Sequence, residues 1–299
     1  MKILLLGANG QVGHELRRSL APLGEVVATT RTGILRNAGT CAIADLGQPV
    51  TLPALIERVA PRLVVNAAAY TSVDKAEDDV ESAFRVNAEA PGVLARACAA
   101  HGIPFVHYST DYVFDGKESR PYCEDDVTRP LGVYGASKLA GEHAVLAAGG
   151  TSLILRTAWV YGSHGHNFLR TMLRLGAERD ELRVVADQQG TPTPAYLIAD
   201  TTARLLAMRE PVRGTLHLTA AGGTTWHGFA EAIIAGAHAR GLLARAPRVL
   251  PITTADFPTR ARRPAYSRMD IAKLESVLGE PMPDWQAGLD HVLDQMVPR

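Results

Sequence analysis

The chain opens with Met1-Lys2-Ile3-Leu4-Leu5-Leu6-Gly7-Ala8-Asn9-Gly10-Gln11-Val12-Gly13. A short apolar run, typical of a buried strand, leads into a GxxGxxG turn, and a helical pattern follows over residues 11–20. Glycines at a strand-to-helix turn let backbone N–H groups approach a pyrophosphate, and the helix N-terminus adds positive potential. Because the motif follows the first strand, it predicts a dinucleotide site. The expected contacts are Gly7, Gly10, Gln11, Val12 and Gly13.

Short apolar runs alternate with helical patterns through the first half of the chain. We expect strands near 26–29, 41–44, 62–66, 104–109 and 152–159, and helices over 52–59, 79–101 and 134–147. Apolar strands separated by helices indicate a parallel sheet with both faces covered. The prediction is therefore an α/β fold with a Rossmann-type, doubly wound parallel sheet.

The second half is less regular and predicts a smaller C-terminal α/β lobe. Helices are expected over 168–177, 198–208, 226–240, 271–278 and 283–296, strands over 182–185 and 215–218, and a Pro- and Arg-rich loop over 247–267. The strand at 215–218 is a candidate to rejoin the main sheet. We therefore divide the chain into a nucleotide-binding domain (1–160 and about 196–220) and a substrate-binding domain (161–195 and 221–299).

Composition limits the class of partner. Of 299 residues, 31 are Lys or Arg and 31 are Asp or Glu, which gives a formal net charge of zero. This balance argues against a nucleic-acid or membrane-surface binder that relies on bulk positive charge. No apolar stretch approaches a membrane span, no signal peptide is recognisable, and three scattered cysteines suit a reducing compartment. We expect a cytoplasmic protein that binds small molecules.

The end of the second expected strand, Thr29-Thr30-Arg31, bears on the choice of dinucleotide. Enzymes that use NAD usually hold the ribose 2′-hydroxyl with an acidic residue at this place, and none is present. Arg31 can instead pair with a 2′-phosphate. The segment therefore favours NADPH, with NADH as the alternative.

Tyr134 and Lys138 form a YxxxK pattern on an expected helix. Residues i and i+4 share a helix face, and an ammonium beside a phenol lowers the pKa of the phenol. Tyr134 would then exchange a proton with a carbonyl oxygen near neutral pH. Thr110 follows the strand at 104–109, at a carboxyl end of the sheet, where it could hydrogen-bond the same oxygen.

Together these motifs resemble those of the extended short-chain dehydrogenase/reductases, and within them the dTDP-4-dehydrorhamnose reductase family. The closer likeness extends over nearly the whole chain. It rests on VNAAAYTSVDKAE (65–77), TDYVFDG (110–116), LRTAWVY (155–161), ADQQGTPT (186–193), Arg262-Arg263-Pro264 and PDW (283–285).

This resemblance implies a reductase that uses NADPH to convert the C4 keto group of dTDP-4-dehydro-β-L-rhamnose into the hydroxyl of dTDP-β-L-rhamnose, for cell-surface polysaccharide synthesis. It implies that Tyr134 donates the proton, that Lys138 tunes Tyr134 and holds the nicotinamide ribose, and that Thr110 orients the substrate. Asp111 and Trp159 would contact the sugar nucleotide. Further dinucleotide contacts would be Asp45, Leu46, Ala69, Tyr70 and Thr71.

Other functions remain as alternatives. Related dehydratases carry an Asp-Glu pair after the Ser/Thr, whereas Asp111-Tyr112 follows Thr110 here, which favours reduction. Another nucleotide-sugar reductase or a 4-epimerase would need the same tyrosine. Some relatives are non-catalytic regulatory subunits of methionine adenosyltransferase, but the retention of Thr110, Tyr134 and Lys138 favours an enzyme.

No metal site is predicted. Some family members form dimers bridged by a metal through glutamates, of which Glu15 is present, but the other regions read Pro194-Ala195-Tyr196 and Asp294-Gln295-Met296. We therefore expect a monomer or a weak homodimer. His164 and His166 lack partners at the spacing of metal ligands and are interpreted as solvated loop residues.

Two further groups of side chains have open or structural interpretations. Arg260, Arg262 and Arg263 either approach a diphosphate or bind carboxylates and carbonyls between the C-terminal helices. Trp226 and Phe229 stand at helical spacing and are expected in the core.

Overall fold

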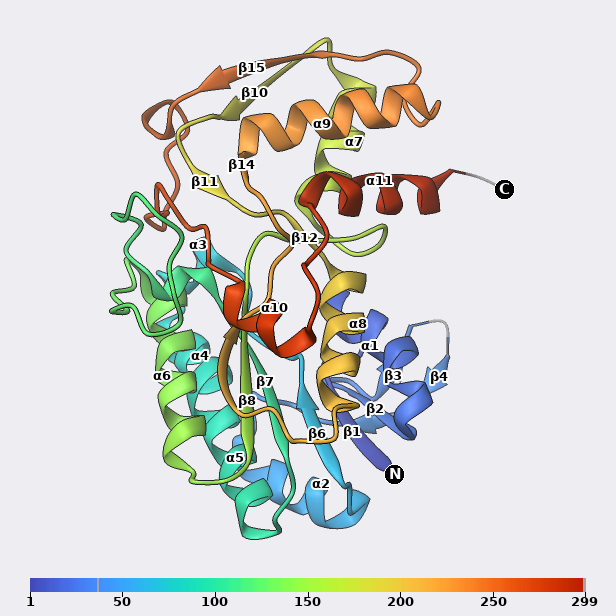
Figure 1. The fold of residues 1–299 in the computed structure, drawn as a ribbon, viewed down its shortest axis with the longest axis vertical. Helices are drawn as coiled ribbons and strands as arrows, with labels where there is room; N and C mark the ends of the chain where they lie inside the picture. The colour runs from blue at the N-terminus through green and yellow to red at the C-terminus, as the bar shows by residue number, and fades with distance from the viewer. Residues whose placement is uncertain (37, 298–299) are drawn as a thin grey trace.

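A seven-stranded sheet forms the centre of the computed structural model, which describes residues 1–36 and 38–297 (Figure 1). The strand order is β13-β8-β7-β6-β1-β2-β5, and all neighbours are parallel. Their bounds are β1 Lys2–Leu6, β2 Glu25–Thr30, β5 Ala42–Ile43, β6 Leu63–Asn66, β7 Phe105–Thr110, β8 Ser152–Thr157 and β13 Gly214–His217. Because β13 pairs with β8, the predicted return of this strand to the main sheet is confirmed.

Helices cover both faces of the sheet. Ile3 and Leu5 pack into a core with α1 (Gln11–Ser19) and α8 (Ala195–Leu206). Leu4 and Leu6 point to the other face, where they pack with α2 (Leu52–Val59), α5 (Ala90–Ala100) and α6 (Val133–Ala147). Burial on both faces explains the continuous apolar run of the first strand and confirms the predicted doubly wound Rossmann-type fold.

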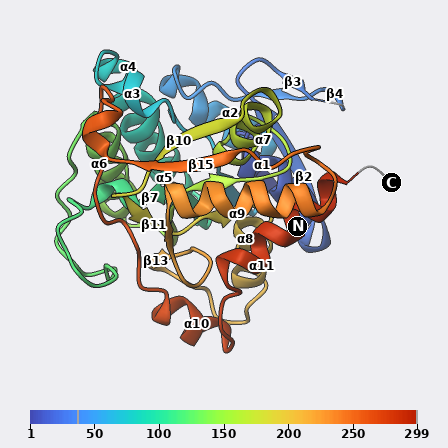
Figure 2. The same ribbon diagram turned by 90° about the horizontal axis from the view of Figure 1, so that it is seen from above.

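A C-terminal lobe, built mainly from elements within residues 161–195 and 221–297, stands above the carboxyl ends of the strands (Figure 1). It contains α7 (Phe168–Glu178), α9 (Trp226–Ala239), α11 (Trp285–Met296) and the parallel pair β10 (Glu181–Val185) and β15 (Arg248–Ile252). Figure 2 shows α9 between β15 and α11. The apolar cluster of the α1/α8 face continues into this lobe through Phe229 and Leu289, so the two parts share one core.

One sequence-based prediction of an element is refined and one is wrong. The expected helix over 79–101 is present as a continuous helical stretch, but a π-helical turn, η3 (Arg85–Glu89), lies between α4 (Val80–Phe84) and α5. The expected loop over 247–267 contains β15 and the 3₁₀ turn η5 (Thr254–Asp256). Pro251 within β15 obscured the strand, and it is tolerated because β15 is an edge strand that pairs with β10 alone.

The remaining elements are short. They are β3 (Ile34–Leu35), β4 (Gly39–Thr40), β9 (Val160–Tyr161), β11 (Gln189–Gly190), β12 (Thr193–Pro194), β14 (Thr224–Thr225), α3 (Val73–Ala76), α10 (Ala272–Leu278), η1 (Ala21–Leu23), η2 (Pro49–Thr51) and η4 (Asp111–Val113). None of the described helices is both long and apolar enough to cross a lipid bilayer.

The order of the strands determines where a ligand can bind. β2 lies on one side of β1 and β6 on the other, so the chain reverses its winding direction at β1. Open α/β sheets bind ligands in the crevice outside the carboxyl ends of the strands at such a reversal. The glycine turn after β1 and the segment 67–71 after β6 both lie at this crevice.

Candidate active site

The glycine turn is shaped for close approach of the backbone. Gly7 has a φ of +79°, and a Cβ there would lie 2.6 Å from the backbone nitrogen of Ala68. A Cβ on Gly13 would lie 2.1 Å from the carbonyl oxygen of Gly7, so α1 reaches the turn only because Gly13 has no side chain. Gly10 precedes α1, whose first turn has no acidic residue. Its N–H groups are therefore suited to an anion such as a dinucleotide diphosphate.

Other expected dinucleotide contacts lie around this turn. Gln11 accepts a hydrogen bond from Asn167 Nδ2 at 2.8 Å, and Val12 is half-buried against the core. Arg31 is exposed directly after β2. Asp45 accepts a hydrogen bond from the backbone N–H of Gly47 at 2.9 Å, and the buried Leu46 follows it. Because β2 and β5 are parallel, these segments meet at the same sheet edge.

Asn87, in the π-helical turn η3, joins the segment after β6 to the helix that carries Tyr134. The backbone N–H of Tyr70 donates to Asn87 Oδ1 at 2.8 Å, and Asn87 Nδ2 donates to the carbonyl of Tyr70 at 3.0 Å. The same Nδ2 donates to Ser137 Oγ at 3.0 Å, and Ser137 Oγ donates to the carbonyl of Tyr134 at 2.8 Å. Ala69 and Thr71 flank Tyr70 in this segment. Sequence reasoning missed Asn87, whose only signal was a polar residue in an Ala-rich helical pattern.

Tyr134 and Lys138 occupy α6, one helical turn apart, as predicted. Burial raises the pKa of Tyr134 to about 12, its contact with Thr110 acts in the opposite direction, and the charge of Asp111 raises the pKa further. The pKa of Tyr134 therefore moves opposite to the direction expected from the YxxxK pattern. Lys138 Nζ donates to the carbonyl of Tyr108 at 2.6 Å, and burial lowers the pKa of Lys138 to about 8. Tyr134 is thus protonated near neutral pH, as an acid must be.

Thr110 and Asp111 form a buried pair at the end of β7. Thr110 Oγ1 donates to Asp111 Oδ1 at 2.9 Å and accepts the backbone N–H of Tyr112 at 3.2 Å. Burial raises the pKa of Asp111 to about 6, and the nearby hydroxyls of Ser267 and Thr110 limit the rise. Among the described residues, Asp111 Oδ2 is buried without a hydrogen-bond partner. An unsatisfied buried acceptor is costly, so this oxygen is suited to a hydroxyl of a ligand.

Trp159 lies just beyond β8, in a left-handed backbone conformation with a φ of +46°. Its indole stacks on that of Trp226 from α9, and a Cβ on Gly190 would lie 2.4 Å from the Trp159 ring. Phe229 is fully buried, as predicted, whereas Trp226 is half-buried and meets Trp159. A residue that was expected only in the core therefore contacts an expected substrate residue.

The arginine cluster binds carboxylates of the first domain. Arg260 pairs with Asp78, and Arg263 Nη2 lies 2.9 Å from Asp74 Oδ2. These two residues therefore bind carboxylates, as the second interpretation expected, but those of residues 74 and 78 and not groups between the C-terminal helices. Arg262 lines a small cavity next to Tyr134.

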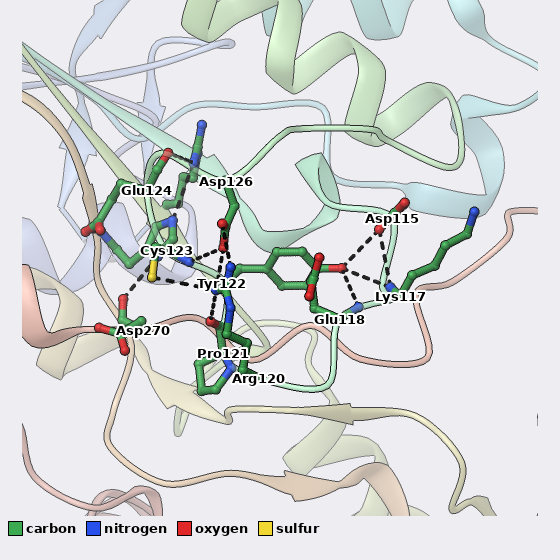
Figure 3. Close-up of polar contacts among 12 residues, drawn as sticks. Asp115, Lys117, Glu118, Arg120, Pro121, Tyr122, Cys123, Glu124, Asp126 and Asp270 are labelled. Carbon is green, nitrogen blue, oxygen red and sulfur yellow. Dashed lines mark hydrogen bonds and ion pairs between the residues drawn. The ribbon is translucent and has the colours of Figure 1, made fainter.

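The loop 115–126 attaches the TDYVFDG segment to the C-terminal lobe (Figure 3). The hydroxyl of Tyr122 donates to Asp115 Oδ1 at 3.0 Å and accepts backbone N–H groups of Lys117 and Glu118. The backbone N–H of Tyr122 donates to the carbonyl of Arg268 at 2.9 Å. The loop that follows Thr110 and Asp111 is thus hydrogen-bonded internally through Tyr122 and to the C-terminal part of the chain at Arg268.

Comparisons with known proteins now identify the family. The family model described as "RmlD substrate binding domain" matches residues 1–297. The dTDP-4-dehydrorhamnose reductase of Burkholderia thailandensis is 52% identical over 297 residues, which is 96% of each chain. The chain belongs to the dTDP-4-dehydrorhamnose reductase family.

Solved structures of this family have the same fold. A dTDP-4-dehydrorhamnose reductase of Clostridium acetobutylicum aligns with a TM-score of 0.90 and 37% identity, over 99% of each chain. That of Bacillus anthracis, solved in complex with NADP, aligns with a TM-score of 0.88 and 32% identity, over 98% of this chain and 99% of that chain. The resemblance noted in the sequence is confirmed at the level of the family and the fold.

Proposed function

We propose that this protein is a dTDP-4-dehydrorhamnose reductase that uses NADPH. The observation that carries the proposal is the arrangement of half-buried Tyr134, one helical turn from buried Lys138 and in contact with Thr110, on a sheet whose first strand leads into a glycine turn shaped for a diphosphate. Relatives of that name match the chain over nearly its whole length, and one was solved with NADP, which supports both the substrate and the cofactor. The substrate is accordingly dTDP-4-dehydro-β-L-rhamnose and the product dTDP-β-L-rhamnose.

The reduction requires one hydride at C4 and one proton on the C4 oxygen. NADPH, when bound, supplies the hydride. Tyr134 gives its hydroxyl proton to the oxygen, and the phenolate that remains is stabilised by the positive charge of Lys138 one turn along α6. Thr110 orients the reacting carbonyl beside Tyr134, and the phenolate regains its proton from solvent.

The remaining residues bind and orient the two ligands. Gly7, Gly10, Gln11, Val12 and Gly13 hold the cofactor diphosphate, and Arg31 binds the 2′-phosphate that distinguishes NADPH from NADH. Asp45, Leu46, Ala69, Tyr70 and Thr71 line the rest of the dinucleotide. Asp111 Oδ2, which has no partner among the described residues, accepts a hydroxyl of the sugar nucleotide, and Trp159 offers it an apolar ring face.

The test is the oxidation of NADPH, followed by absorbance, with enzymatically prepared dTDP-4-keto sugar. Tyr134→Phe should lower kcat by about 10²–10⁴-fold, because it removes the acid. Tyr112→Phe is the matched control. It also removes one phenolic hydroxyl, and the Tyr112 ring packs edge-on against the Tyr134 ring with centroids 5.7 Å apart. Equal rates for wild type and Tyr134→Phe would contradict the assignment of the acid.

Two outcomes would favour the alternative functions. Product analysis by NMR reads the stereochemistry at C4, so an epimerised or different sugar would point to another nucleotide-sugar enzyme. Absence of turnover, together with co-purification of a methionine adenosyltransferase, would point to a regulatory subunit.

The domain boundaries, location and assembly of the protein are also proposals. We propose a nucleotide-binding domain of residues 1–160 and about 196–220 and a sugar-nucleotide domain of the C-terminal lobe. We propose a cytoplasmic location and a monomer or weak homodimer without a metal bridge. Size-exclusion chromatography with and without EDTA tests the assembly, and a dimer that dissociates in EDTA would contradict it.

A further inference from the structure

Three potential metal ligands come together beside the glycine turn. His14 and Glu15 belong to α1, and His164 belongs to the loop between β9 and α7. One donor atom from each side chain lies within 4.8 Å of the other two. His164 Nδ1 is 3.6 Å from Glu15 Oε1, and the imidazole centroids of His14 and His164 are 4.1 Å apart. His164 is therefore not a solvated loop residue without partners, as its sequence neighbours had suggested.

The donor set fits a tetrahedral transition metal. Two imidazoles and a carboxylate are ligands that Zn²⁺ takes readily. Bonds of about 2.0–2.1 Å to a tetrahedral ion place neighbouring donors about 3.4 Å apart. The 3.6 Å between His164 and Glu15 already approaches this value, and since all three donors lie within 4.8 Å of one another, the His14 donor needs to approach by at most about 1.4 Å. His14 is exposed, which leaves room for water as a fourth ligand.

The loop that carries His164 is held in place by its backbone. Asn167 Nδ2 donates to the carbonyls of Gly162 and His164, at 2.9 and 3.0 Å, and to Gln11 Oε1 at 2.8 Å. Within the described part of the chain, the Nε2 atom of the His164 ring is buried without a hydrogen-bond partner. The Nδ1 atom of the same ring faces Glu15, and because the backbone of this loop is held in place, His164 loses little entropy on binding an ion.

We propose that His14, Glu15 and His164 form a binding site for a divalent transition metal, with Zn²⁺ as the preferred ion. The site lies within one chain and shares only Glu15 with the glutamates that bridge dimers in some family members. Its bound ion ties the loop 162–167 to α1, beside Gln11 and the glycine turn. The site does not depend on the proposed reductase activity, because none of its ligands is a proposed catalytic residue.

Isothermal titration of untagged, EDTA-stripped protein with Zn²⁺ tests the proposal, with Mg²⁺ as the ion of poorer fit. One Zn²⁺ should bind per chain, and Co²⁺ in its place should show the intense visible bands of a tetrahedral site. His164→Ala and His14→Ala should each weaken Zn²⁺ binding by about 100-fold or more, since even outer-shell changes cost 10–100-fold. Zn²⁺ should also raise the Tm of wild type but not of His164→Ala.

His166→Ala is the matched control, because it removes an exposed imidazole from the same loop. It should bind Zn²⁺ like wild type. His14→Ala and His164→Ala change an exposed and a half-exposed side chain, and an unchanged Tm without metal will show that these two variants fold. Equal Zn²⁺ affinity of wild type and His164→Ala would overturn the proposal, as would equal loss in His166→Ala or no binding of Zn²⁺ at all.

Discussion

The indole of Trp159 lies flat against the indole of Trp226, with ring centroids 3.6 Å apart and an angle of 6° between the planes. Trp159 follows a strand of the central sheet, and Trp226 begins α9 of the C-terminal lobe. A non-glycine residue with positive φ is strained by about 1–3 kcal/mol, and only its surroundings can hold it there. The stack with Trp226 and the close approach of Gly190 provide those surroundings.

Loss of this stack should weaken binding of the sugar nucleotide. Trp226→Ala should raise KM for the sugar by about tenfold, because aromatic pairs contribute about 0.5–1.5 kcal/mol beyond burial and the Trp159 ring would lose its support. Trp226→Phe should retain most of the affinity. Steady-state kinetics at varied concentrations of sugar nucleotide measure this KM. An unchanged KM in Trp226→Ala would show that Trp226 does not contribute to substrate binding.

Activity should depend on pH in a bell shape. Asp111, with a pKa of about 6, is protonated below that pH and then cannot accept a sugar hydroxyl through a charged oxygen. Lys138, with a pKa of about 8, loses its charge above that pH and no longer stabilises the phenolate. A profile of kcat/KM should therefore fall below about 6 and above about 8. In Asp111→Asn the acidic limb should disappear and the basic limb remain; an unchanged acidic limb would exclude Asp111 as its source.

The buried ion pair between Glu142 and Arg156 should matter for both stability and catalysis. Arg156 donates to the two carboxylate oxygens of Glu142 at 2.9 and 2.7 Å, and both side chains are buried. Glu142→Gln should destabilise the fold by about 3–5 kcal/mol, because an unpaired charge remains buried. It should also move the basic limb to lower pH, since the charge of Glu142 raises the pKa of Lys138.

Urea unfolding and the pH profile measure these two effects. The control is Glu178→Gln, which breaks an exposed pair with Arg174 and should cost under about 0.5 kcal/mol. Similar losses for Glu142→Gln and Glu178→Gln would show that burial of the first pair has no energetic consequence.

The bridge through Asn87 should position Tyr134. Asn87→Ala removes three hydrogen bonds that join Tyr70 to Ser137 and should lower kcat by about tenfold or more, because misplacement of the acid by a fraction of an ångström slows proton transfer. Ser137→Ala removes the bond from Asn87 and the bond to the carbonyl of Tyr134 but keeps both bonds between Asn87 and Tyr70, and it should have a smaller effect. Single-turnover rates measure both effects. A larger decrease in rate for Ser137→Ala than for Asn87→Ala would contradict this order.

Arg31 should determine the preference for NADPH. Arg31→Ala should weaken NADPH by about 10–100-fold, the worth of charge-assisted hydrogen bonds, and leave NADH unchanged. Fluorescence titration with each dinucleotide measures both affinities. Arg36→Ala, an exposed arginine nearby on the chain, is the control. An equal loss of affinity for NADPH and NADH in Arg31→Ala would show that Arg31 does not recognise the 2′-phosphate.

Features that depend on neighbours in sequence were predictable. The glycine turn was predictable because Gly7 has a positive φ and Gly13 packs on Gly7 six residues earlier, although the close approach of Gly7 to Ala68 depends on the neighbouring strand. Tyr134 and Lys138 share a helix face by periodicity alone. The continuous apolar strands indicated a sheet covered on both sides, and the structure has it.

Features that depend on the three-dimensional environment of a side chain were not predictable from the sequence. The pKa of Tyr134 was expected to fall beside Lys138, but burial raises it, and burial is a property of the whole fold. The π-helical turn around Asn87 was hidden in an Ala-rich pattern, because periodicity over a few residues does not resolve one extra residue in a turn.

By itself, the sequence thus determined the fold class, the dinucleotide turn and the tyrosine–lysine pair, since short-range periodicity and backbone freedom encode all three. Tertiary packing alone brought Trp226 to Trp159, Asn87 to Ser137, and His164 to Glu15. These partners lie far apart along the chain, and their distances follow from how the lobe and the helices pack on the sheet, which no local pattern records.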